Sequence, residues 1–142
     1  MFKFKVFRKK PNAGKQRTSK YGRALRQGVK QSAMMVRATA VESISNGSPS
    51  GIIYQKYNPR RTHKASSPGE PPATDTGYLV NNIAVVIDVD GLGASIESRA
   101  AYSAALEFGT SQMQARPFMQ PAIEENRPKI ARLMAELARR FD

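Results

Sequence analysis

The chain has 142 residues, which suits one compact domain that buries a core without a covalent staple. It contains no cysteine, which excludes disulfides, thiolate metal sites and cysteine nucleophiles. The net charge of +12 is uneven: residues 1–72 hold 16 Lys and Arg against 2 acids, whereas residues 73–142 hold 7 against 9. Such asymmetry indicates a basic region that faces nucleic acid, an acidic protein or an anionic surface, or that simply keeps the chain soluble.

Residues 1–17 are interpreted as a basic N-terminal arm, separate from a single domain over residues 18–142. Residues 1–7 alternate apolar and basic side chains, which predicts a short strand. This segment lacks the apolar stretch of a secretory signal. No run of residues approaches the roughly 18 apolar positions of a membrane span, so no membrane partner is expected.

A long amphipathic helix is predicted over residues 18–45, with Thr18 or Ser19 as its N-terminal cap. Its apolar positions recur at intervals of three or four residues, which places them on one helical face. They are Leu25, Val29, Ala33, Val36, Ala40 and Ile44. Asn46 and Gly47 tolerate the left-handed conformation that ends helices. This helix should pair an apolar face with a basic one.

Residues 46–77 carry five prolines and four glycines, which predicts a long flexible loop with a brief strand at Ile52 to Tyr54. The loop holds a basic and aromatic cluster that could contact a partner. The cluster comprises Tyr54, Tyr57, Arg60, Arg61, His63 and Lys64.

The rest of the chain predicts a β-hairpin followed by two helices. Ile83, Val85, Ile87 and Val89 alternate as the core face of a strand, and residues 90–93 form its turn. A short helix is expected over residues 100–108 and a long one over residues 118–140. A kink or short break is expected at Pro128. The fold class is therefore α+β, with two long helices packed on a small antiparallel sheet and a long Pro/Gly-rich loop.

The residues suggest no catalytic, metal or cofactor site, so the chain is not expected to be an enzyme. His63 is the only histidine and has no Cys, Asp or Glu at ligand spacing. Asp88 and Asp90 are explained by the turn they flank. There is no Ser-His-Asp pattern and no phosphate-binding glycine motif.

Three segments occur in a specific order. The first segment is Ser67-Pro68-Gly69-Glu70-Pro71-Pro72-Ala73-Thr74-Asp75-Thr76-Gly77-Tyr78-Leu79, which follows Arg61-Thr62-His63-Lys64. The second is Ala101-Tyr102 followed by Leu106-Glu107-Phe108-Gly109-Thr110. The third is Ala115-Arg116-Pro117-Phe118-Met119 followed by Pro121-Ala122. Together they resemble the phage neck or tail-completion (head–tail joining) family typified by gene product ten of a lambdoid siphophage. The resemblance covers roughly residues 20–140, and Pro128 and the basic N-terminal extension depart from it.

The resemblance implies a structural virion protein of a tailed bacteriophage or prophage, made in the host cytoplasm and located in the neck of the particle. It implies a ring, a hexamer on the particle, between the tail-tube or tail-terminator protein and the head connector, with transient contact to DNA in the channel. The residues expected at subunit or partner interfaces are Arg60, Arg61, His63, Lys64, Glu107 and Arg116. The structural family motif comprises Asp75, Thr76, Gly77, Glu107, Phe108, Gly109, Thr110, Arg116, Pro117 and Phe118.

Physical reasons accompany these motif residues. Gly109 frees the chain to turn after Phe108, and Arg116 before proline favours an extended approach to the last helix. Phe118 is expected to anchor that helix against the sheet. Glu107 and Arg116 are candidates for an ion pair within or between subunits.

Two other functions remain open at this stage. A basic nucleic-acid-binding protein would use its Lys and Arg on phosphates and stack Tyr54 and Tyr57 on bases. A small hydrolase would use His63 as its general base, and this needs a nucleophile and an acid to converge on it.

Overall fold

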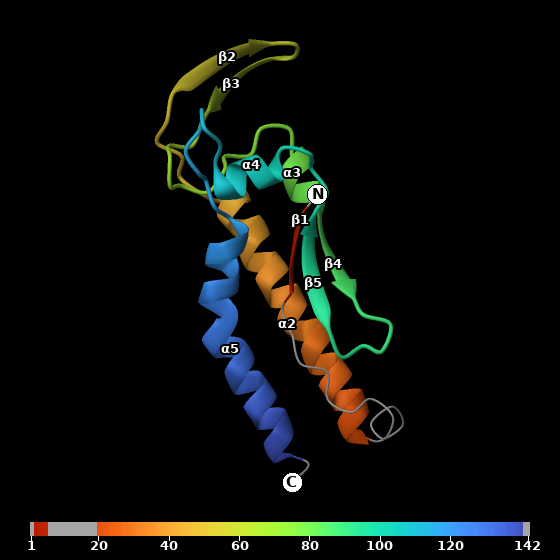
Figure 1. Cartoon of the computed structure of the whole chain (residues 1–142). Helices are drawn as coiled ribbons and strands as arrows, with labels where there is room; N and C mark the ends of the chain where they lie inside the picture. The colour runs from red at the N-terminus through yellow and green to blue at the C-terminus, as the bar shows by residue number, and fades with distance from the viewer. Residues whose placement is uncertain (1, 6–19, 141–142) are drawn as a thin grey trace.

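The structure, a computed structural model, describes residues 2–5 and 20–140. In chain order the elements are β1 (Phe2–Lys5), α2 (Lys20–Ser45), β2 (Ile53–Tyr57), β3 (Arg60–Lys64), α3 (Tyr78–Asn81), β4 (Ile83–Ile87), β5 (Ala94–Ser98), α4 (Ser103–Phe108) and α5 (Met119–Arg139). The α+β class is confirmed, and Figure 1 shows the arrangement of the elements. The predicted caps Thr18 and Ser19 and most of the basic arm lie outside the described residues.

The helix α2 is the centre of three layers, with the main sheet on one side and α5 on the other (Figure 1). The sheet has the order β1-β5-β4, and both pairings are antiparallel. Phe4 and Val85 flank Ile96, which is fully buried in the central strand. The prediction placed both long helices on the sheet. Instead, α2 covers the sheet and α5 runs antiparallel to α2 on its far side.

The apolar stripe of α2 forms the main core as its spacing predicted, because every member except the half-buried Leu25 is buried. Arg37 fastens α2 to the sheet, since its Nε donates to the carbonyl of Ile83 at 2.8 Å. Gly28 lets α5 approach: a Cβ there would lie 2.5 Å from Cδ1 of Leu137. On the same interface, Asn126 Nδ2 donates to Thr39 Oγ1 at 2.8 Å.

The structure corrects one prediction at the end of β4 and one inside α5. β4 stops at Ile87, and both Ile87, at 37% exposure, and the fully exposed Val89 lie outside the core that they were expected to face. The reason is that the chain already turns after Asp88, whose carbonyl accepts the N–H of Gly91 at 2.8 Å. α5 continues through Pro128, so of the two alternatives expected there, a kink or a short break, the break does not occur. Pro128 lies on an exposed face of the helix, where water can satisfy the carbonyl that loses its helical partner.

The predicted long loop is also corrected, because residues 53–64 form the two-stranded antiparallel hairpin β2–β3. Only the Ile52 to Tyr54 part of this structure was anticipated. Residues 46–52 and 65–77 on either side have no regular secondary structure. Among residues 2–5 and 20–140, no helix is both long enough and apolar enough to cross a membrane.

Candidate functional site

The β2–β3 hairpin projects from the end of the molecule where α3 and α4 lie (Figure 1). An isolated two-stranded hairpin is at best marginally stable in water, so this one needs support from the body of the protein. Because side chains alternate along a strand, the hairpin has two faces. We call the face with the cross-strand pairs Tyr54–His63 and Lys56–Arg61 the inner face, and the face with Ile53–Lys64 and Tyr57–Arg60 the outer face.

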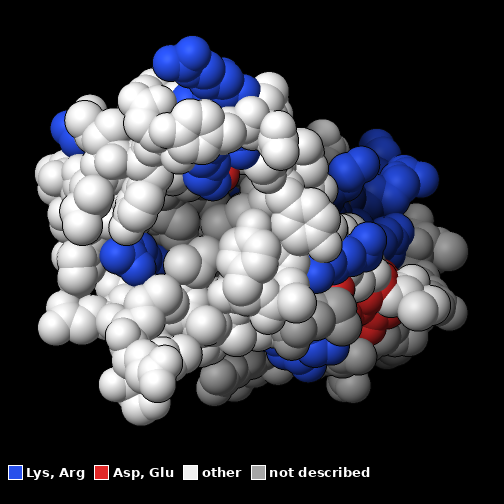
Figure 2. Space-filling view, turned by 90° about the horizontal axis from the view of Figure 1, so that it is seen from above, with Lys and Arg blue, Asp and Glu red and all other residues white. Residues whose placement is uncertain are grey.

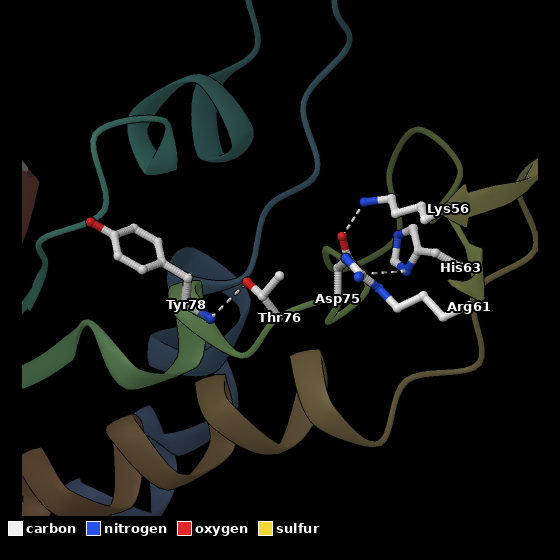
Figure 3. Close-up of polar contacts among 6 residues, drawn as sticks. All are labelled: Lys56, Arg61, His63, Asp75, Thr76 and Tyr78. Carbon is white, nitrogen blue, oxygen red and sulfur yellow. Dashed lines mark hydrogen bonds and ion pairs between the residues drawn. The ribbon is translucent and has the colours of Figure 1, made fainter. Parts of the chain in front are cut away.

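Asp75 fastens the inner face to the body (Figure 3). Its carboxylate bonds Lys56 Nζ and lies 3.1 Å from Arg61 Nε and 3.9 Å from His63 Nδ1. The hydrogen bond from Lys56, followed by the one from Arg61, lowers the pKa of Asp75 from 3.8 to about 2. Asp75 is therefore ionised across the neutral range and binds Lys56 and Arg61, one from each strand, with His63 beside them.

Glu70 secures the base of the hairpin. Its carboxylate accepts the hydroxyl of Ser50, the N–H of Ser67 at 2.8 Å and the N–H of Ser50 at 3.1 Å. These hydrogen bonds, with that of the Ser50 hydroxyl the largest, lower the pKa of Glu70. Backbone hydrogen bonds between residues 51–52 and Ala65 extend the ladder at the same place. The two acids of residues 46–77 thus both serve to position the hairpin.

A cleft of about 410 Å³ opens between the inner face and the body. Its walls come from the hairpin, the segment 72–79, α4 and Arg116, and its most prominent side chains are Tyr54, His63, Tyr78, Tyr102, Leu106 and Arg116. The rings of Tyr78 and Tyr102 lie with their centroids 6.1 Å apart. Partial burial, then Tyr78 and Asp75, raise the pKa of Tyr102, so its hydroxyl remains a hydrogen-bond donor at neutral pH.

Glu107 has a role that the sequence did not reveal. Only 4% of this residue is exposed, and its carboxylate accepts the N–H groups of Phe118, Met119 and Gln120 at 2.9, 2.9 and 2.7 Å. These are N–H groups at the start of α5, where negative charge also complements the helix dipole. The ion pair expected with Arg116 is not formed within the chain, because Glu107 turns to the start of α5 and Arg116 Nε donates to Ser66 instead.

Arg116 instead connects α4, the cleft and the loop before α3. Its backbone N–H donates to Leu106 at 2.6 Å, and its Nε donates to the carbonyl of Ser66 at 3.3 Å. The next two motif residues, Pro117 and Phe118, bring the chain to α5. Phe118 is buried with its ring centroid 6.1 Å from that of Phe2 in β1, as the anchoring prediction requires.

The remaining motif residues shape two turns. Gly109 has φ +75° and ψ 176°, a backbone conformation nearly restricted to glycine, and a Cβ there would lie 2.9 Å from the carbonyl oxygen of Met113. Thr110 exchanges backbone hydrogen bonds with Met113. Gly77, at φ +78°, precedes α3, and Thr76 Oγ1 accepts the N–H of Tyr78 at 3.4 Å.

Phe108 differs from these turn residues because it is 65% exposed. Its ring still meets those of Phe2 and Phe4 in β1, at centroid distances of 5.6 and 6.4 Å. Phe108 therefore helps to hold β1 beside α4 while most of its surface stays open.

The outer face of the hairpin is uncovered. Ile53 is 62% and Tyr57 72% exposed, and the neighbouring Ile52 is exposed as well. Arg60 and Lys64 are also exposed, and neither makes an ion pair with any described residue. Figure 2 looks onto this end of the molecule, where Lys and Arg stand out from a mostly uncharged surface that shows little acidic area.

The structure therefore separates the six expected interface residues. Arg61 and His63 meet at Asp75, Arg60 and Lys64 stand on the outer face, Arg116 lines the cleft, and Glu107 is buried under α5. Sequence reasoning missed the positioning roles of Glu70 and Asp75 and the cleft residues Tyr78 and Tyr102. The signal for the first pair was available, because these are the only two acids between residues 43 and 87 and they follow a cluster of five basic or histidine side chains.

Within residues 2–5 and 20–140, no group of three or more His, Asp or Glu side chains is placed to hold a metal ion. Comparison with family models, with curated proteins and with solved structures finds no match for the chain. The geometry and charge of the described residues are therefore the guide to function, and the most distinctive feature of this structure is the projecting β2–β3 hairpin.

Proposed function

We propose that the chain is a non-catalytic assembly protein whose hairpin docks on a neighbouring protein chain. The observation that carries this proposal is the outer face, where Ile53 and Tyr57 are exposed although the body of the protein positions the hairpin firmly through Asp75 and Glu70. A surface that is fastened to the body by hydrogen bonds and ion pairs while its apolar side chains stay in water is typical of an interaction site. Docking would cover these side chains and lose little conformational entropy.

The composition of the outer face favours protein over nucleic acid. Isoleucine gains little from a phosphate backbone, and nucleic-acid interfaces are more polar and more positively charged than protein interfaces. Protein interfaces place aliphatic and aromatic residues at the centre and charged residues at the rim. The outer face offers both kinds of residue: Ile53 and Tyr57 supply apolar area, and their cross-strand partners Lys64 and Arg60 supply charge.

We further propose that the larger assembly is the neck of a tailed phage or prophage particle, in which the chain forms a hexameric ring between the tail and the head connector. The resemblance to the neck and tail-completion family supports this assignment. A hairpin that projects from the subunit end suits contact with the next subunit or the next ring. The basic character of residues 1–72 would then be repeated once per subunit, facing an acidic partner protein and, transiently, the DNA.

Gene deletion and complementation in the phage or prophage test this function. Without the chain, electron microscopy should show filled heads and separate tails. The wild-type gene should restore joined particles, and the double variant Ile53→Ser with Tyr57→Ser should not. Val89→Ser is the control, because Val89 is an even more exposed apolar residue, in the turn between β4 and β5, and it should restore joining.

Normal particles in the deletion strain would refute the assembly role, and full rescue by the double variant would refute the role of the outer face. The alternative of a nucleic-acid-binding protein predicts another result: the purified chain alone would bind DNA tightly, and its affinity would fall steeply with salt.

A further inference from the structure

We propose that the cleft beneath the hairpin binds an extended acidic segment of the partner chain, in which carboxylates alternate with proline or aromatic residues. This inference rests on the docking role proposed above and adds a second, chemically defined contact to it. The outer face and the cleft belong to the same hairpin, so one partner can engage both.

Charge around the cleft favours an anion. Arg116 lines it, and Lys56 and Arg61 stand on the hairpin face that forms one wall. One carboxylate, Asp75, opposes these three cations, and its hydrogen bonds to Lys56 and Arg61 keep it turned toward the hairpin (Figure 3). Arg116 and Asp75 line the cleft itself, and Lys56 and Arg61 stand next to it as partners of Asp75, so these four side chains carry a net charge of +2. A carboxylate that enters the cleft would therefore meet a surplus of positive charge.

Hydrogen-bond donors in the cleft are free to meet that carboxylate. Arg116 uses its Nε on Ser66, and its terminal guanidinium nitrogens form no hydrogen bond with any described residue. The hydroxyls of Tyr54, Tyr78 and Tyr102 are likewise without a hydrogen bond to the described part of the chain. Guanidinium pairs with carboxylate in a bidentate geometry, and this is stronger than a neutral hydrogen bond.

The tyrosine rings explain why a bare anion would not be the best ligand. Tyr78 and Tyr102 are each about half exposed and lie side by side, and Leu106 is close to them in the wall. Aromatic rings of this kind pack against proline and other aromatic residues while their hydroxyls stay hydrogen-bonded. Alternation of carboxylates with such residues in an extended segment would satisfy both halves of the cleft.

Fluorescence anisotropy with the full-length protein tests the proposal directly. The probes are a fluorescein-labelled peptide of alternating Glu and Pro-Tyr units and the same peptide with Gln in place of Glu. The wild type should bind the Glu peptide about tenfold or more tightly than the Gln peptide, as the loss of one charge-assisted hydrogen bond implies. Arg116→Gln should weaken Glu-peptide binding about tenfold on the same grounds.

Arg60→Gln is the matched control, since it removes the same charge from the same end of the molecule but from the outer face. Its effect should stay below about twofold, the range expected for a distant, screened charge. Tyr102→Ala should weaken binding of both peptides, because it removes a packing surface, and circular dichroism should show that each variant is folded.

Three results would overturn the proposal: equal binding of the Glu and Gln peptides, equal losses for the Arg116 and Arg60 variants, or tighter Arg116-dependent binding of a labelled single-stranded oligonucleotide. Failure here leaves the docking role separately testable. If Ile53→Ser with Tyr57→Ser still blocks joining, the cleft assignment alone is wrong.

Discussion

The fold depends strongly on one buried carboxylate, so replacement of Glu107 is a sharp test of the structure. Glu107 lies in α4 but accepts three backbone N–H groups at the start of α5. Glu107→Ala would leave the N–H groups of Phe118 and Met119 buried without partners. Gln120 is exposed, so water can replace the lost acceptor there.

The magnitude follows from the two buried donors. An unsatisfied buried donor costs about 1–3 kcal/mol, and loss of negative charge at a helix N-terminus adds about 0.3–1 kcal/mol. We therefore expect Glu107→Ala to lower the free energy of unfolding by about 4 kcal/mol, a large part of the roughly 5–15 kcal/mol of a typical domain. Glu107→Gln keeps one acceptor oxygen and should cost about 2 kcal/mol.

Urea denaturation followed by far-ultraviolet circular dichroism measures these differences. For a chain of this size a loss of about 4 kcal/mol corresponds to a fall in Tm of about 10–15 °C. Glu124→Gln is the control, because Glu124 is an exposed glutamate within α5 that pairs only with neighbouring side chains, and its effect should stay within about 0.5 kcal/mol. If the Glu107 variants were no less stable than the Glu124 variant, the N-terminal cap of α5 would be refuted.

Three further predictions follow from other parts of the molecule. The folded pKa of Asp75 is below its unfolded value of about 3.9, so the contribution of Asp75 to stability is complete above that value and disappears as pH falls toward about 2. An NMR titration of the carboxyl carbon should find a midpoint near 2, and Lys56→Met should raise this midpoint. A wild-type midpoint near 4 would contradict the ion pairs. Gly109→Ala should lower the free energy of unfolding by about 3 kcal/mol, measured by urea denaturation, because the new side chain meets both backbone strain and a backbone clash. Gly69→Ala, at φ +85° with open space around it, should cost about 1 kcal/mol. Equal losses would contradict the turn geometry. Asn126→Ala should cost about 1–2 kcal/mol, since it removes the hydrogen bond to α2, and an unchanged urea midpoint would argue against that contact.

Periodicity predicted the elements of the fold that bury one apolar face. The stripe of α2 predicted both a helix and the residues that it buries, whereas the alternation of β4 predicted a strand but not its burial, since Ile87 and Val89 are exposed. The position of α5 was not predictable in this way. Its stripe shows only that one face is covered, and Gly28 on the partner helix decides where α5 can come close.

The site was harder to predict because its parts come from distant segments. Prolines and glycines in residues 46–77 indicated a loop, yet the hairpin forms because Asp75 and Glu70 supply contacts that local propensity does not include. For the same reason Glu107 was interpreted as a partner of Arg116. Its acceptors fit a helix start that only the folded chain brings next to it.

Photo-crosslinking in assembled particles tests the central claim most directly. A photoreactive phenylalanine analogue would replace Tyr57 on the outer face or, as a control, Val89, which is even more accessible. The account predicts that position 57 crosslinks to a protein subunit, either another copy of the chain or an adjacent ring protein, and does so much more efficiently than position 89. Crosslinks from position 57 to DNA, or no crosslinks from it in complete particles, would contradict the docking role of the hairpin.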